Sequence, residues 1–178
     1  MDGPERRPIE NLASIVGRLA FMIDERLSPS DVATLRRMRP DDIAAPVFWR
    51  IAASELADAL AGDGARRDEQ ERRWASILQA MAELRGMHDP HSSLGAALVR
   101  ADVAEQRALK LLRASGDALL DAVRVIAHHL ATKGVPVNAT DLARLVLSDG
   151  RVDEEAVRRR IARDYYAALE KKEAEIRP

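Results

Sequence analysis

Apolar side chains recur at the spacing of an α-helix through much of this sequence. In residues 9–27 they fall on one face of a helix with 3.6 residues per turn, at Leu12, Ile15, Val16, Leu19, Ile23 and Leu27. Aromatic residues make up only 3% of the chain, and alanine and leucine, which favour helices, supply much of its 47% hydrophobic content. The sequence therefore predicts an all-α fold.

Proline and glycine divide the rest of the chain into further helices. We expect these over residues 30–38, 46–60, 66–85, 93–99, 102–115, 117–133 and 140–147, with a long last helix that starts near Asp153. The segment Gly86–His91 is the most loop-like stretch between them. We expect a boundary there between two bundle-like halves, residues 1–87 and 88–178, which together form one continuous unit.

No motif of a common enzyme class is present. The chain has no cysteine, which excludes disulfides and thiolate sites, and it has no serine-hydrolase elbow, phosphate-binding loop or His-Glu-x-x-His sequence. His128 and His129 are adjacent, so on a helix they point about 100° apart, and His88 and His91 could supply at most two metal ligands. We expect no catalytic residue, no cofactor, no metal and no small-molecule substrate.

The apolar residues are not arranged for a membrane. No uninterrupted apolar run approaches the roughly 18 residues of a transmembrane helix, and the first residues do not lead into the apolar core of a signal peptide. The sequence predicts a cytoplasmic protein without membrane contact.

Basic residues are numerous, but acids balance them. The net charge is −1, so any binding of nucleic acid must come from local clusters of cations. Lysine supplies only four of the 28 basic residues, and the planar guanidinium of the others suits phosphate groups. A GC-rich genome would also favour arginine, so this preference alone does not decide the function.

Three cations form a stripe on the helix expected after Asp102. Arg107, Lys110 and Arg113 recur every three residues and span about 120° of one face. No acid stands four residues from Arg107 or Lys110 to pair with it. The stripe is either a solvated face or a surface that meets an anion.

The last helix carries a second group of arginines. We expect Arg159 to pair with Glu155 and Arg160 with Asp164, four residues away in each case, which leaves Arg163 unpaired. Such clusters are typical of proteins that contact a phosphate backbone without reading bases.

Four segments carry a more specific signal. They are Leu35-Arg36-Arg37 with Pro46-Val47-Phe48-Trp49-Arg50, Ser93-Leu94-Gly95-Ala96-Ala97-Leu98 with Glu105-Gln106-Arg107 and Leu111-Leu112-Arg113, Leu120 to Arg124 with Gly134-Val135-Pro136-Val137, and Arg158 to Tyr166. In this order they resemble the CasB family, the small subunit of type I-E CRISPR complexes. The chain departs from the family at Ala96, where a basic residue is common, and at Ala139-Thr140, where many members have tryptophan.

The resemblance implies a helical, non-catalytic subunit that supports the guide RNA, the target DNA and the displaced DNA strand. It also implies a second copy of the chain and contacts with the backbone and large subunits of the complex. Basic positions of the family are matched at 36, 37, 50, 107, 113 and 124, and the helical faces add 110 and 163. The candidate nucleic-acid-binding residues are therefore Arg36, Arg37, Arg50, Arg107, Lys110, Arg113, Arg124 and Arg163.

Two other interpretations remain open on the sequence alone. Residues 140–147, the turn at Asp149-Gly150 and the helix from Asp153 could form a helix-turn-helix of a transcriptional regulator. Alternatively, the chain could be a helical interaction protein with no nucleic-acid role, whose arginines are solvated or paired.

Overall fold

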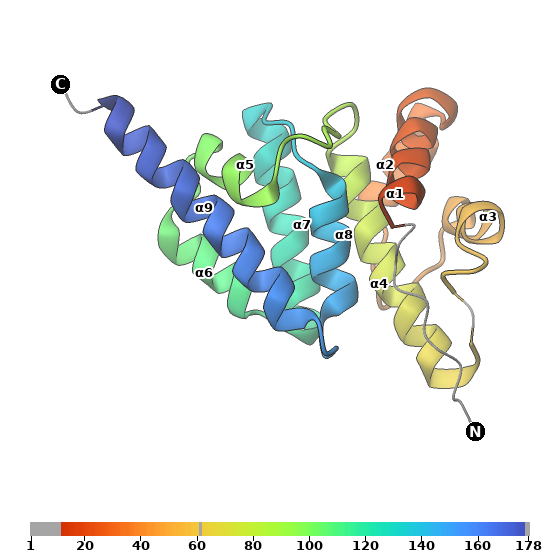
Figure 1. The fold of residues 1–178 in the computed structure, drawn as a ribbon. Helices are drawn as coiled ribbons and strands as arrows, with labels where there is room; N and C mark the ends of the chain where they lie inside the picture. The colour runs from red at the N-terminus through yellow and green to blue at the C-terminus, as the bar shows by residue number, and fades with distance from the viewer. Residues whose placement is uncertain (1–11, 61, 177–178) are drawn as a thin grey trace.

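The fold consists of helices joined by turns and short loops. The computed structural model describes residues 12–60 and 62–176, and within these ranges β-pairing is limited to isolated bridges (Figure 1). The elements are α1 (Leu12–Phe21), the π-helical turn η1 (Met22–Arg26), α2 (Pro29–Arg37), α3 (Pro46–Glu55), α4 (Gly64–Glu83), α5 (Leu94–Arg100), α6 (Glu105–Arg113), α7 (Gly116–Lys133), α8 (Ala139–Ser148) and α9 (Glu154–Ile176). The predicted all-α class is confirmed.

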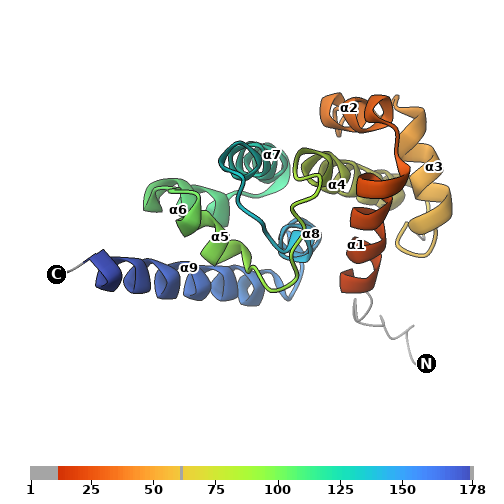
Figure 2. The same ribbon diagram turned by 90° about the horizontal axis from the view of Figure 1, so that it is seen from above.

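Helix α4 lies in the middle of the molecule. In both views α3 lies on one side of it and α5, α6, α7 and α9 lie on the other, and Figure 2 shows α1, α2 and α3 around its right-hand part (Figures 1 and 2). It packs against α2 on the first side and against α7 and α8 on the second. One hydrophobic core runs across both sides, from Leu12 and Phe48 through Trp74 to Leu98 and Val123. The division at residues 87 and 88 stays a proposal; the core itself is continuous.

Short polar side chains begin several of the helices. The hydroxyl of Ser28 accepts a hydrogen bond from the Asp31 backbone N–H at 3.0 Å, and Pro29 fills the first position of α2. Asn138 caps α8 in the same way, by accepting from Thr140 N at 3.0 Å. These caps satisfy backbone donors that have no partner within the helix.

Cationic side chains occupy the opposite ends of other helices. Arg36 Nε donates to the carbonyl of Ala82 at 2.9 Å, at the end of α4. Arg158 donates to Leu112 O at 2.8 Å and Ala114 O at 2.7 Å, at the end of α6, and Arg73 donates to Asp149 O at 2.9 Å, just after α8. The last carbonyls of a helix lack intrahelical donors and carry partial negative charge, so these arginines stabilise the fold.

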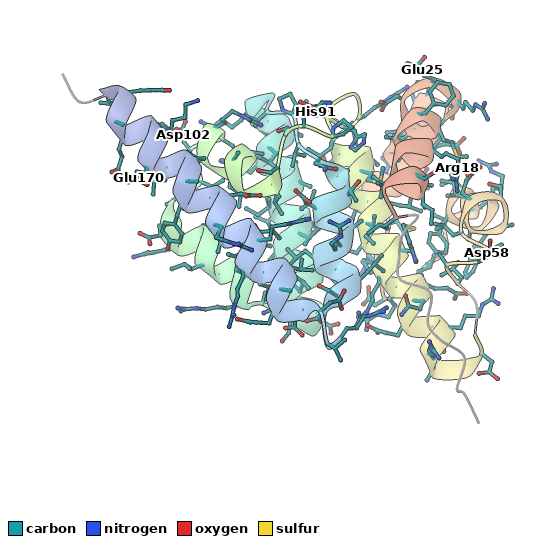
Figure 3. The ribbon with its side chains drawn as sticks, viewed as in Figure 1. Arg18, Glu25, Asp58, His91, Asp102 and Glu170 are labelled. Atoms are coloured by element: carbon teal, nitrogen blue, oxygen red, sulfur yellow. The ribbon has the colours of Figure 1, made fainter. Side chains whose placement is uncertain are left out.

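Two local expectations were wrong. The helix expected from Asp102 begins only at Glu105; Asp102, labelled in Figure 3, has a φ of 57°, and its carboxylate pairs with Lys172 of α9 at 2.7 Å. Arg160 does not pair with Asp164; it reaches across to Asp141 of α8, whose carboxylate also accepts from Leu94 N at 3.0 Å. For Arg160 a partner from a distant helix replaces the neighbour four residues away.

Candidate nucleic-acid interface

A polar groove lies between the C-terminal end of α2, the middle of α4 and the first half of α7. Its volume is about 550 Å³. Five arginines line this α2/α7 groove: Arg36, Arg37, Arg39, Arg72 and Arg124. Three of them, Arg36, Arg37 and Arg124, are among the predicted binding residues, and the fold brings them together from distant parts of the sequence.

Three aspartates, Asp41, Asp117 and Asp121, also line the groove, so its charge is mixed. Two of them are already paired. Asp41 accepts from Arg39 at 3.2 Å, which lowers the pKa of the Asp41 carboxyl, and Asp117 accepts from Arg72 at 2.6 Å, which raises the pKa of Arg72. Among the described residues that line the groove, the five arginines outnumber the three aspartates by two positive charges.

The excess positive charge of the groove belongs to arginine side chains that are exposed to solvent. Within the described residues, Arg37 and Arg124 are exposed and form no ion pair or side-chain hydrogen bond. Arg36 is exposed too and uses its Nε for the carbonyl of Ala82, so its two terminal nitrogens remain available. These three guanidinium groups are the part of the groove best suited to an incoming phosphate.

The predicted stripe of α6 lies beside this groove. Ala108 and Leu111 turn into the core, so Arg107, Lys110 and Arg113 face outward, and none of the three forms an ion pair with another described residue. Asp121 of α7 lines both the α2/α7 groove and a second groove bordered by Arg107 and Lys110. The stripe and the α2/α7 groove therefore lie on adjoining parts of one face, on either side of α7.

The other two candidates lie elsewhere. Arg50 of α3 forms an ion pair with Asp31 of α2 at 2.9 Å, so part of its charge is already neutralised. Arg163 is exposed on α9, has no ion pair within the described residues and lines neither groove. The structure gathers six of the eight predicted residues on one face and separates these two from it.

Sequence reasoning did not select Arg72 as part of the site. Glu69 stands three residues before it and does form a pair with it at 3.5 Å, which is the pattern of an ordinary surface salt bridge. Only the packing of α4 against α7 brings Arg72 to Asp117 and into the groove. Arg39 could have been selected from the sequence, because it lies next to the pair Arg36 and Arg37.

Two of the histidines lie within hydrogen-bond distance of backbone groups of other segments. His88 Nδ1 accepts a hydrogen bond from the Ala139 backbone N–H at 3.2 Å, and burial lowers the pKa of this imidazole below its usual 6.5. His129 Nε2 lies 2.9 Å from the carbonyl oxygen of Ala101. In residues 12–60 and 62–176 no three histidine or acidic side chains are placed to hold a metal ion. None of the helices described is long and apolar enough to cross a membrane.

Comparison with known families shows to which family the chain belongs. A family model for the CRISPR-associated protein Cse2 matches residues 31–166, about three quarters of the chain. The chain belongs to the Cse2 family. This is the CasB family of small subunits that the four sequence segments resemble, so that prediction is confirmed, and the matched range contains all eight candidate residues. Neither a curated protein nor a solved structure gives a significant match.

Proposed function

We propose that this member of the Cse2 family is a non-catalytic small subunit of a type I-E CRISPR ribonucleoprotein in the cytoplasm. It binds the backbone of guide RNA and target DNA without sequence preference and stabilises the opened target. Its other partners are a second copy of the chain and the backbone and large subunits of the complex. One observation carries the proposal: Arg36, Arg37 and Arg124 converge in a groove whose arginines outnumber its aspartates.

The chemistry of this groove suits a phosphate backbone better than base edges. Arginine binds phosphate through paired hydrogen bonds, and each contact releases counterions regardless of sequence. In a guide-directed complex the guide RNA reads the target by base pairing, so the protein needs only to hold the strands. The α6 stripe extends the cationic surface across α7.

The arrangement of α9 argues against a DNA-reading regulator. In a helix-turn-helix the second helix presents its side chains to the major groove. Here Arg158 is largely buried against Leu112 and Ala114, and Arg160 pairs with the buried Asp141. Two of the arginines that such a helix would use are therefore already engaged by other parts of the protein: Arg158 is largely buried, and Arg160 is paired although 39% of its side chain is exposed.

The proposal is tested in the assembled complex. The chain is co-expressed with the other type I-E subunits and the guide RNA from its own genome, and the complex is purified through a different subunit. Target binding is then measured over a salt series for the wild type and for an Arg37→Ala, Arg124→Ala double variant. Loss of two phosphate contacts makes the negative slope of the logarithm of the binding constant against the logarithm of the salt concentration shallower by about 1.4–1.8.

Arg159→Ala serves as the matched control. Arg159 is an exposed arginine of α9 that pairs with Glu155 at 2.8 Å and lines neither groove. We expect its salt slope to equal that of the wild type. A wild-type chain that does not co-purify would reject membership of the complex, and an unchanged slope in the double variant would reject the groove as the contact site.

A further inference from the structure

A second groove, between α6 and α7, differs in character from the first. Its volume is about 400 Å³, and its floor is aliphatic: Leu111, Ala118, Ala122, Val125 and Ile126. Arg107 and Lys110 line it from α6, and Asp121 lines it from α7. Val125 has 47% of its surface exposed in the middle of a helix, so this α6/α7 groove keeps apolar surface in contact with water.

Nucleic acid would not cover this floor well. A phosphate backbone contacts the two cations and leaves the aliphatic side chains exposed. A base placed in the groove would lay its polar edge against side chains that offer no hydrogen bond, which costs free energy. In the part of the chain that the structure describes, no aromatic side chain lines the groove, so the stacking that binds unpaired bases in other proteins has no platform there.

A protein segment satisfies both features of the groove. Arg107 and Lys110 are three residues apart on one helix, so their stems are about 5–6 Å apart, and neither has a carboxylate partner within the described residues. Carboxylates on an incoming segment would neutralise them, while its aliphatic residues would cover Val125 and its neighbours. An amphipathic segment in an apolar groove is a common mode of protein recognition.

We propose that the α6/α7 groove binds an amphipathic, acidic segment of another protein subunit, with its aliphatic side chains on the floor and two carboxylates facing Arg107 and Lys110. This rests on the part of the proposed function that places the chain in a complex, and not on nucleic-acid binding. The two proposals compete for Arg107 and Lys110, so the experiment must separate them.

The first arm of the test changes the floor of the groove. Val125→Asp puts a carboxylate among the aliphatic side chains and repels an acidic segment. Val152→Asp is the matched control, because Val152 is fully exposed in the turn before α9 and lies outside the groove. In the co-expression assay we expect Val125→Asp to lower the amount of the chain retained in the complex at least tenfold, and Val152→Asp to leave it unchanged.

The second arm identifies the occupant. A photo-cross-linking residue, benzoylphenylalanine, replaces Val125 in the purified complex, and the cross-linked product is mapped by mass spectrometry. We expect a peptide of another protein subunit that carries aliphatic residues and at least two Asp or Glu residues. Cross-linking to guide RNA, to target DNA or to a second copy of this chain would overturn the proposal.

The outcomes also separate this proposal from the proposed function. If the wild-type chain does not join the complex, the proposed function fails. If the wild type and Val125→Asp join equally well while thermal melts show both to be folded, the groove proposal alone is wrong. Reduced retention of Val125→Asp with an intact salt slope in the fraction that still assembles supports a protein partner, since the nucleic-acid contacts are then unaffected.

Discussion

A Cβ atom on Gly95 would collide with the backbone carbonyl oxygen of Ile161. It would also meet the backbone nitrogen of Tyr165, so α5 and α9 pack backbone against backbone at this point. Neither neighbour is the flexible end of a side chain, and the two helices would have to move apart. We predict that Gly95→Ala lowers the free energy of unfolding by about 1–3 kcal/mol, measured by urea denaturation.

Gly17 provides the control for this prediction. It lies inside α1, and apart from its chain neighbours and the backbone of its own helix, no atom of the described residues stands within 4 Å of the position of its Cβ. Alanine is favoured over glycine inside a helix by about 0.5–1 kcal/mol. Gly17→Ala should therefore stabilise the protein by that amount. A Gly95→Ala protein as stable as the wild type would show that the helices do not approach this closely in solution.

Two adjacent arginines of α9 should differ sharply in their effect on stability. Arg158 is largely buried and bonds to the carbonyls of Leu112 and Ala114 and to the carboxylate of Asp149. Its removal leaves these groups without their cation, and we predict that Arg158→Ala costs about 3–5 kcal/mol of unfolding free energy. The change is measured by thermal and urea unfolding.

The neighbouring substitution tests whether burial is the cause. Arg159 has 74% of its side chain exposed and makes a surface pair with Glu155. Arg159→Ala should change the unfolding free energy by no more than about 0.5 kcal/mol. Equal losses in the two variants would mean that Arg158 does not hold the end of α6.

The arginines at 158–160 also show which features cannot be predicted from the sequence. Apolar periodicity, proline and glycine predict the helices well, because these are local properties of the chain. Which member of the run Arg158-Arg159-Arg160 is buried depends on the helices that α9 crosses, and their positions are set by packing between distant segments. The predicted partner of Arg159 is correct for this reason, since it is local, and that of Arg160 is wrong.

The candidate interface divides in the same way. The stripe of Arg107, Lys110 and Arg113 could be predicted as an outward face from helical spacing alone. That Arg36 and Arg124 share a groove follows from no pattern in the sequence, and these residues were selected through the family resemblance. The aliphatic α6/α7 groove could not be predicted from the sequence, because the residues of its floor have the pattern of ordinary core residues of two helices.

Stability should depend on pH through His88. Burial lowers the pKa of His88 in the folded protein below 6.5, and the charges of Asp24 and Asp89 oppose this shift only in part. Between the lowered pKa and 6.5 the unfolded chain therefore binds more protons than the folded one. We predict that the contribution of neutral His88 is complete above pH 6.5 and is lost as the pH falls below it, measured by urea unfolding between pH 7.5 and 5.

A substitution at His88 isolates this contribution from other titrating groups. In His88→Asn the amide oxygen takes the place of Nδ1 as acceptor for the Ala139 N–H, but it does not titrate. Between pH 7.5 and 5 the unfolding free energy of this variant should therefore fall by less than that of the wild type. His91→Asn, at an exposed position three residues away, should retain the whole of the wild-type change. Identical pH profiles for all three proteins would exclude His88 as the cause.

The eight candidate residues should not contribute equally to target binding. Arg50 is held by Asp31 at 2.9 Å, whereas Arg124 has no ion-pair partner among the described residues and lines the α2/α7 groove. We predict that Arg124→Ala reduces the slope of log K against log salt by about 0.7–0.9 in the assembled complex, the value of one phosphate contact. Arg50→Ala should leave the slope unchanged, because its charge is already balanced within the protein.

The Asp31–Arg50 pair offers a direct test of this reasoning. Asp31→Asn removes the carboxylate and frees Arg50 while it preserves the shape of the side chain. If pairing is what excludes Arg50 from the interface, the salt slope of Asp31→Asn should be steeper than that of the wild type, and adding Arg50→Ala should restore it. A slope that falls in Arg50→Ala alone would show that nucleic acid displaces Asp31, and that the interface extends from the α2/α7 groove onto α3.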